Sequence, residues 1–322
     1  MLGAIVIVGS GSSAASSLTR AGFPLACVEV LGRSVLGRQL SDLRRVGIDA
    51  IALLAQSNLS SARTELEYAA NASLSFVDDA WMAASEQLAA YRVSGFNSII
   101  VIHASAYAEL NYSDILQFHK EQAEGVTRVV SPDGPLDVWV FDVAALAKSQ
   151  QITDVLRSEV GARYWFPNYV NRLQNPRHLR QLVTDTFNGA TRLRPDGVEA
   201  RPGVWMSEGA DVHRGARIVA PAYIGRGSRI EEQCLITRCS NIESNCRIDY
   251  GTVVEDSMIL PNTYIGIGLD ISHSIVCGSS LMNLERDVTL EIGDPGVVRQ
   301  NRVLRKEVSR PSSNAFGLLE VH

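Results

Sequence analysis

Hydrophobic residues in the first half of the chain alternate between short continuous runs and runs with helical spacing. Residues 4–8 form an apolar, β-branched run, which predicts a buried parallel strand. Ser34 precedes apolar positions three and four apart from Leu36 to Leu43, which predicts a capped helix before a strand at 50–54. Strands that alternate with helices in this way predict an α/β sheet with helices on both faces.

The same patterns predict further elements up to Gly189. These are a short strand at 25–30, a strand at 98–103, and helices at 78–91, 112–122 and 176–187. Asn175 and Pro176 are an N-cap and a first-turn proline for the last helix, and Gly189 ends it.

From residue 212 onward the period changes to six. The aliphatic positions are Val212, Ile218, Ile224, Ile230, Ile236, Ile242, Ile248, Val254 and Leu260. A small residue stands four places after each of the first seven: Ala216, Ala222, Ser228, Cys234, Ser240, Cys246 and Thr252. This pattern is typical of hexapeptide repeats, whose stacked coils bury one large and one small residue. The phase moves by one residue at Ile265 and Ile271, where we expect a bulge or loop.

A polar stretch broken by proline and glycine separates the two periodicities. We therefore predict an α/β domain at 1–190, a linker at 191–203, a repeat domain at 204–298 and a C-terminal tail at 299–322.

Composition narrows the classes of function. With 322 residues, 46% of them hydrophobic, the chain is long and apolar enough for two folded domains. A net charge of −5 lacks the basic footprint of a nucleic-acid binder. Five scattered cysteines without zinc spacing predict a reducing, cytoplasmic setting, and the opening apolar run is too short to span a membrane.

The first predicted strand leads into a glycine- and serine-rich loop. Its sequence fits G-x-G-x-x-A from Gly9, and Glu29 follows twenty residues later, where a dinucleotide-binding domain places its ribose-binding acid. A flavin- or NAD-binding redox protein is therefore one alternative.

Three segments resemble motifs of the sugar-1-phosphate nucleotidyltransferases, also called nucleotide-sugar pyrophosphorylases. FPLACVEVLGRSVLGRQLSDLRRVGIDAIALLA (23–55) is similar to their PK-x-L-x-P-V-x-G-x-P-L-L segment, helix and next strand. SIIVIHASAYAELNYSDILQFHKEQ (98–122) is similar to their N-G-D strand, loop and following helix. YVNRLQNPRHLRQL (169–182) resembles their W-x-D-I-G-T-P-E-D-Y turn and helix. Many members end in a left-handed β-helix of hexapeptide repeats. The resemblance implies a shortened nucleotidyltransferase-like α/β domain, a left-handed parallel β-helix, and a place in nucleotide-sugar and polysaccharide-precursor metabolism.

The motifs lack the charged residues that this chemistry needs. The two Mg²⁺-binding acids of the family align with Ser105 and Arg172, the lysine of Pro-Lys aligns with Phe23, and the sugar-phosphate lysine has no counterpart. What the resemblance leaves is a phosphate-binding remnant, formed by Gly9, Ser10, Gly11, Ser12, Ser13 and the shifted cation Arg20. We expect a non-catalytic, regulatory or scaffolding member, with Mg²⁺ as a cofactor only if nucleotidyl transfer survives at a displaced site.

Hexapeptide-repeat acyltransferases offer another alternative, because they use a histidine at a coil edge as general base. His213 and His273 are the candidates, although His213 is expected to face solvent and His273 to mark the phase change.

Other prominent side chains are predicted to be structural. We expect His103 at a strand end, His119 at the exposed end of a helix, and Cys234 and Cys246 in the coil core. The expected packing residues are Trp81, Trp139 and Trp165, and the expected solvated acids are Glu231, Glu232 and Glu243. The expected partners are a nucleotide or nucleotide-sugar and, through the β-helix, a second copy or an active homologue, with no nucleic acid and no membrane.

Overall fold

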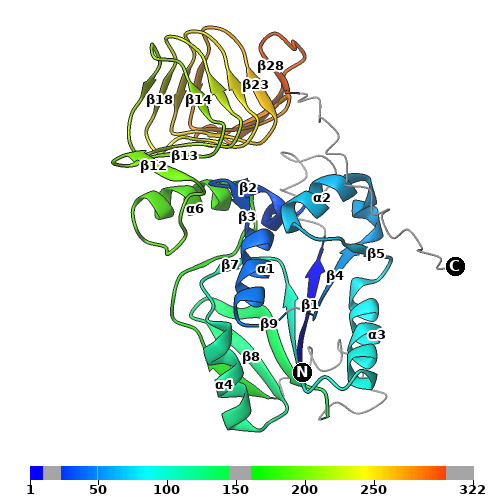
Figure 1. Cartoon of the computed structure of the whole chain (residues 1–322). Helices are drawn as coiled ribbons and strands as arrows, with labels where there is room; N and C mark the ends of the chain where they lie inside the picture. Colours follow the sequence, from blue (N-terminus) through cyan, green and yellow to red (C-terminus); the bar gives the residue numbers. More distant parts are fainter. Residues whose placement is uncertain (10–22, 49, 145–160, 302–322) are drawn as a thin grey trace, which may run out of the picture.

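The structure is a computed structural model that describes residues 1–9, 23–48, 50–144 and 161–301. Figure 1 shows two regions: an α/β region, residues 1–190, and a stack of short strands, residues 198–301, which we call the strand stack. No helix among the described residues is both long enough and apolar enough to cross a membrane.

The α/β region is built on a seven-stranded sheet with the order β10-β8-β9-β6-β1-β4-β5. Its strands are β1 (Leu2–Val8), β4 (Ala50–Gln56), β5 (Ser75–Val77), β6 (Ser98–His103), β8 (Val126–Ser131), β9 (Gly134–Asp142) and β10 (Ala162–Trp165). β1 lies between β4 and β6 and is parallel to both, whereas β9 is antiparallel to β6 and β8. The three strands predicted from continuous apolar runs are thus the centre of the sheet.

Helices cover both faces of this sheet, as predicted. They are α1 (Val35–Arg45), α2 (Arg63–Ala70), α3 (Ala80–Val93), α4 (Tyr112–Gln122) and α6 (Pro176–Phe187). Val6 of β1 packs in the same core as Leu40 of α1 and Ile115 of α4, whereas Ile5 packs in the core of α3. Alternate side chains of one strand therefore serve two helical layers.

The local signals place most helix ends correctly. The Ser34 hydroxyl accepts the Gly37 N–H at 2.9 Å, and the Asn175 side chain caps α6. α3 begins at Ala80 because Asp79 is its N-cap. The predicted strand at 25–30 is wrong in its first half: Leu25–Cys27 is a 3-10 helix (η3), and only β2 (Glu29–Val30) is extended.

Short two-stranded pieces and a second 3-10 helix complete the α/β region. They are β2 with β3 (Arg33–Ser34), β7 (Tyr107–Ala108) with β11 (Val170–Asn171), and η4 (Ser57–Ala62). The β2–β3 hairpin turns at Leu31 and Gly32, whose φ angles are 53° and 89°. Two successive positive φ angles suit the two-residue hairpin turn that matches strand twist.

The strand stack consists of three sheets whose strands follow one another in rotation. The first, which we call the junction sheet, holds β12 (Val198–Arg201), β13 (Val204–Met206), β16 (Ala222–Ile224), β19 (Asn241–Ile242), β22 (Met258–Ile259), β25 (Ser274–Cys277), β26 (Ser280–Asn283) and β27 (Val288–Glu291). The second holds β14 (Asp211–Val212), β17 (Arg229–Ile230), β20 (Arg247–Ile248), β23 (Thr263–Ile265) and β28 (Val298–Gln300). The third holds β15 (Arg217–Ile218), β18 (Leu235–Thr237), β21 (Val253–Glu255) and β24 (Asp270–Ser272). Parallel pairing in all three sheets is compatible with a β-helix.

The register corrects the predicted phase. Ile242 pairs with Ile259, which lies in the core of the stack, so the period shortens between Val254 and Ile259 and not at Ile265. Leu260 is buried in the core of the α/β region instead. The pairing interval changes with it, from Tyr223 opposite Asn241 to Asn241 opposite Met258.

The small residues of the repeat have a second role besides filling space. Ser228 Oγ accepts the Cys246 N–H at 2.9 Å, and Ser240 Oγ accepts the Ser257 N–H at 3.1 Å. Each hydroxyl thus satisfies a buried N–H of the next coil, where no water reaches. Cys234 lies buried in the same kind of position, as predicted.

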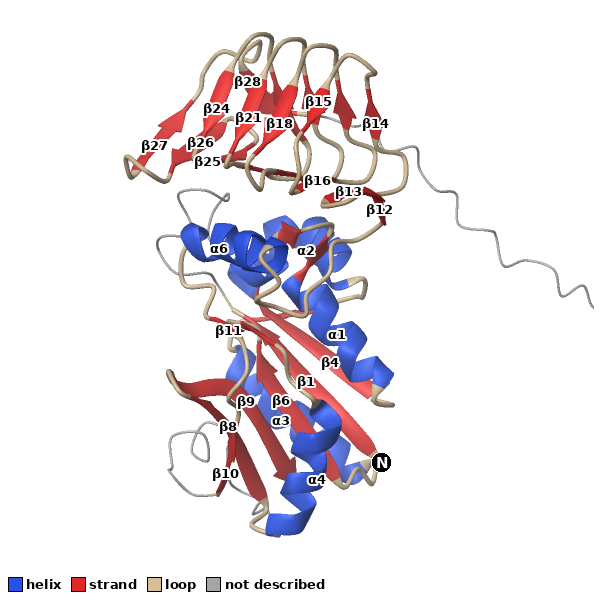
Figure 2. Cartoon of the chain, turned by 90° about the vertical axis from the view of Figure 1, so that its left-hand side faces the viewer, coloured by secondary structure: helices blue, strands red, loops and turns tan. Residues whose placement is uncertain are grey.

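The junction between the two regions is a continuous packed layer. The outward side chains Tyr223, Met258 and Ile275 of the junction sheet are buried in the same core as Leu179 and Leu182 of α6. Figure 2 shows α6 and α2 lying directly beneath the stack. Because these apolar side chains share one core, their burial stabilises the contact between the two regions.

Candidate functional site

The candidate site lies where the order of the parallel strands reverses. The chain passes from β1 to β4 on one side and later to β6 on the other, so the carboxyl ends of β1 and β6 diverge at Gly9 and His103. In open α/β sheets this crevice is the usual ligand site. The carboxyl end of β1 also lies on the side of the sheet nearer the strand stack (Figure 1).

Three polar side chains meet at this point. Asp137 Oδ2 lies 3.3 Å from His103 Nδ1 and accepts the Ser105 hydroxyl at 2.7 Å. His103 ends β6, Ser105 follows it, and Asp137 comes from the neighbouring antiparallel strand β9. The His103 side chain is 29% exposed and that of Asp137 46%, so both are accessible to a solute.

The imidazole of His103 lies close to the backbone of Gly9. A Cβ atom on Gly9 would lie 2.7 Å from His103 Nε2, so a side chain at position 9 would force the imidazole to move. The ring of Trp81 lies 5.9 Å from that of His103, and Trp139 packs edge-on against Trp81. Trp81 and Trp139 are packing residues, as predicted, but they also form one wall of the candidate site.

Asp137 is the anion of the site. Burial raises the pKa of its carboxyl, but hydrogen bonds from His103 and Ser105 and the charges of His103 and Arg172 outweigh burial and lower the pKa. The group is therefore a carboxylate at neutral pH, engaged by an imidazole and a hydroxyl.

Arg172 is the cation near Asp137, and it also forms hydrogen bonds to the turn between β8 and β9. Its Nη1 donates to the Pro135 carbonyl at 2.7 Å, and its Nη2 donates to the Gly134 carbonyl at 3.0 Å and to Ser131 Oγ at 3.1 Å. These contacts hold the turn between β8 and β9. Asp137 lies on β9, two residues after Pro135.

The residues of this site do not fit a catalytic Mg²⁺. Its described side chains bring one carboxylate, Asp137, together with an imidazole and a guanidinium, whereas Mg²⁺ selects carboxylate and phosphate oxygens. In the described parts of the chain no three His, Cys, Asp or Glu side chains are grouped so that they could hold a metal ion. Ser105 and Arg172, the positions aligned with the family's metal acids, are both engaged by protein atoms.

The phosphate-binding remnant can be followed only at its first residue. Gly9 lies at the site, while Ser10, Gly11, Ser12, Ser13 and Arg20 lie outside the described residues.

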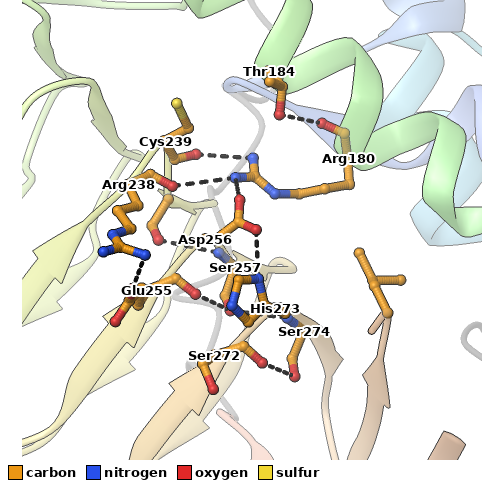
Figure 3. A network of polar contacts seen from close by, with 12 residues as sticks. Arg180, Thr184, Arg238, Cys239, Glu255, Asp256, Ser257, Ser272, His273 and Ser274 are labelled. Carbon is orange, nitrogen blue, oxygen red and sulfur yellow. Dashed lines mark hydrogen bonds and ion pairs between the residues drawn. The ribbon is translucent and has the colours of Figure 1, made fainter. Parts of the chain in front are cut away.

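The two histidines considered for acyl transfer lie far apart in the stack. His213 Nδ1 accepts the N–H of Gly215 at 3.1 Å within its own turn. His273 Nδ1 lies 2.7 Å from Asp256 Oδ2, and Asp256 Oδ1 lies 2.5 Å from Arg180 of α6 (Figure 3). His273 thus belongs to a network that joins α6 to the stack.

Three predictions about single residues are wrong. His119 is buried, with Nδ1 at 2.8 Å from Thr127 Oγ1, and Trp165 is exposed. Glu243, expected in solvent, is buried at the junction, because the α/β region covers that face of the stack.

Glu29, the acid of the dinucleotide-binding alternative, does not face the candidate site. It is buried at the junction, where its Oε2 accepts the Ser244 hydroxyl at 2.7 Å.

Asp137 is the site residue that the sequence analysis missed. The alternation along β9 places Asp137, Trp139 and Phe141 on one face of the strand, so a polar residue at the end of an apolar face was the available signal.

Neither a protein-family model nor a curated protein matches this chain.

Proposed function

We propose that this chain is a non-catalytic relative of the sugar-1-phosphate nucleotidyltransferases that binds a nucleotide or a nucleotide-sugar at the carboxyl ends of β1 and β6. The observation that supports this proposal is that His103 and Ser105 engage the carboxylate of Asp137, with the charge of Arg172 nearby, and that no three His, Cys, Asp or Glu side chains of the described residues group to hold a metal ion. Nucleotidyl transfer depends on acids that hold Mg²⁺ on the phosphates, and these side chains do not supply them.

The accessible groups suit a polyhydroxylated, phosphorylated ligand. Asp137 can accept hydroxyls of a sugar, and His103 and Ser105 offer donors to hydroxyl or phosphate oxygens. The ring of Trp81 beside His103 adds an apolar surface of the kind that sugar and base rings contact.

The strand stack has a separate part in this proposal. We assign it as a left-handed β-helix of hexapeptide repeats that forms homo-oligomers or pairs with an active homologue, which makes the chain a regulatory or scaffolding subunit. The parallel register of three sheets and the six-residue period support the assignment.

Ligand binding tests the proposal directly. The purified chain is titrated with nucleotide-sugars, nucleoside triphosphates, sugar-1-phosphates and acyl-CoA, each with Mg²⁺ and with EDTA, by thermal shift and calorimetry. We expect a nucleotide or nucleotide-sugar to bind equally well in EDTA, adding about 2.7 kcal/mol of stability at one hundred times Kd. Pyrophosphate release from a triphosphate and a sugar-1-phosphate is expected to stay at background.

A matched pair of variants locates the site. Asp137→Asn removes the anion that positions His103 and Ser105, and we expect it to weaken binding about tenfold or more. Asp133→Asn changes an exposed acid in the turn between β8 and β9 and should leave binding unchanged. Mg²⁺-dependent turnover, binding of acyl-CoA alone, or no binding of any compound would each overturn the proposal.

A further inference from the structure

Two buried carboxyl groups face each other across the junction. Glu29 lies on β2 of the α/β region, and Glu243 follows β19 of the junction sheet. Both side chains are buried. The acids are neighbours because Ser244, next to Glu243, donates its hydroxyl to Glu29 at 2.7 Å. Buried acids that approach each other disfavour simultaneous ionisation.

Glu243 holds the turn of the β2–β3 hairpin. Its Oε1 accepts the Leu31 N–H at 2.7 Å, and its Oε2 accepts the Gly32 N–H at 2.9 Å. Leu31 has a φ of 53°, a conformation that is costly for a residue with a side chain. The two hydrogen bonds from the strand stack therefore stabilise a strained turn of the α/β region.

The surroundings of the pair favour a neutral acid. Burial and the charge of Glu29 raise the pKa of Glu243 to about 7 and outweigh the hydrogen bonds from Gly32, Leu31 and Asn241, which lower it. Burial likewise raises the pKa of Glu29 and outweighs its hydrogen bonds from Ser244. The other charged or titratable groups that face the pair are Arg38 of α1, Arg226 and Asp196, Tyr223 of β16 and Cys246. Arg38 Nη2 donates to the carbonyls of Val30 and Leu31, and its Nη1 donates to the Arg194 carbonyl.

Asn241 can accommodate both protonation states of Glu243. Its amide lies 2.6 Å from Glu243 Oε1, a separation typical of an O–H···O bond. Asn241 Oδ1 is buried and has no hydrogen-bond partner among the described residues. With the amide turned over, Oδ1 accepts a hydrogen bond from the protonated carboxyl group of Glu243, whereas in the present orientation the Asn241 NH₂ group donates to a carboxylate.

We propose that the Glu29–Glu243 pair is a proton-controlled latch that couples docking of the β2–β3 hairpin on the strand stack to pH. With Glu243 protonated, the hairpin is held on the stack. Ionisation places two negative charges in the closed junction, and the hairpin separates more often, because separation lets water reach both carboxylates.

Hydrogen exchange of the Leu31 and Gly32 amides tests the latch in the intact chain. Protection factors, which remove the intrinsic effect of pH on exchange, are compared between pH 5.5 and pH 8.5. For a group with a pKa of about 7 when docked and 4.5 when exposed, we expect protection to fall about thirtyfold over this range. Amides of Ile230 and Ile248 in the stack core should keep their protection.

Variants decide whether Glu243 is the group that titrates. Glu243→Gln is neutral at every pH and keeps an oxygen for the hairpin, so its protection should not change with pH. Glu29→Gln should reduce the change, and Glu232→Gln, an exposed glutamate of the same stack, should behave like the unmodified chain.

Three results would overturn the latch: constant protection in the unmodified chain, an undiminished fall in Glu243→Gln, or an undiminished fall in Glu29→Gln. The last variant decides the matter if Glu243→Gln does not fold.

Discussion

At the scale of single residues, two glycines with similar positive φ angles lie in different surroundings. Gly32 and Gly47 have φ angles of 89° and 83°. A Cβ atom on Gly32 would overlap the Tyr223 hydroxyl and lie 2.7 Å from Asp196 Cβ, whereas nothing lies within 4 Å of one on Gly47. The first glycine is therefore required by the junction and by the turn, the second by the turn alone.

Alanine substitutions separate these two requirements. Gly47→Ala should lower the free energy of unfolding by about 1 kcal/mol, the cost of a left-handed residue with a side chain. Gly32→Ala should cost about 3 kcal/mol or more, because Tyr223 and the hairpin must also move. Urea denaturation of both variants measures the difference, and equal losses would show that the junction tolerates the extra methyl group.

Residue-level predictions succeeded where a role is local and failed where it depends on distant packing. Ser34 and Asn175 cap their helices as predicted, because capping involves only the next three residues. Glu243 could not be placed, since its burial depends on a hairpin more than two hundred residues earlier in the chain. Asp137 and His103 likewise meet only after β6 and β9 have paired.

At the scale of elements, α6 is fastened to the strand stack by arginines of unequal burial. Arg180 is 7% exposed and donates to Asp256 at 2.5 Å and to the Cys239 carbonyl at 2.9 Å. Arg177 is 44% exposed and pairs with Asp287, which is 75% exposed. The guanidinium of Arg180 is thus buried, although Asp256 is 40% exposed, whereas both partners of the Arg177 pair are exposed and screened by water.

Replacing each arginine with methionine should show that the buried Arg180 contributes more to stability than the exposed Arg177. Arg180→Met leaves carbonyls without donors at the junction and should cost about 2 kcal/mol or more in the free energy of unfolding. Arg177→Met should cost less than about 1 kcal/mol, as exposed ion pairs do. Chemical denaturation compares the two, and a larger loss for Arg177→Met would contradict the assignment of Arg180 as the main polar fastening.

The serine positions of the repeat make a similar prediction. Ser240 donates to the Thr237 carbonyl at 2.6 Å and accepts the Ser257 N–H, so Ser240→Ala should cost about 1–3 kcal/mol by leaving that N–H unpaired. Ser240→Cys should cost less, because cysteine already occupies the equivalent positions 234 and 246. Thermal unfolding of both variants checks the order.

Most elements could be predicted from the residues that form them. α4 and α6 have the predicted bounds, and the six-residue period marks the strand stack. The one-residue shortening was placed too late, because Leu260 is as apolar as Ile259 and only packing against the α/β region distinguishes them. α2 was missed, since its eight residues carry only two buried side chains, Leu66 and Ala70.

At the scale of the whole molecule, the buried acid at the junction makes stability depend on pH. Glu243 has a higher pKa in the folded chain than the 4.5 of a free glutamate, so the folded state holds a proton that the unfolded state has lost. The free energy of unfolding should therefore fall by about 3 kcal/mol as pH rises from 4.5 to 7 and then level off. Asp137, whose pKa is lowered, acts oppositely and below pH 3.8.

Urea denaturation at pH 5 and pH 8 measures this contribution. The unmodified chain should be less stable at pH 8, and Glu243→Gln should lose most of the difference. A chain that is more stable at pH 8 would mean that other groups outweigh Glu243.

The unequal lengths of the coils bear on how the chain finds its alignment during folding. If all coils had the same length, strands could pair one whole coil out of register during folding and still keep every aliphatic side chain inward. Here Ile224 pairs with Ile242 eighteen residues on, but Ile242 pairs with Ile259 and Ile259 with Val276, each seventeen residues on. In a chain paired one coil out of register, a seventeen-residue coil would lie where an eighteen-residue coil belongs, and its strands would be shifted by one residue. A shift of one residue turns inward side chains outward. The change in coil length therefore disfavours displaced alignments, because only near the native alignment do all coils keep their aliphatic side chains inside.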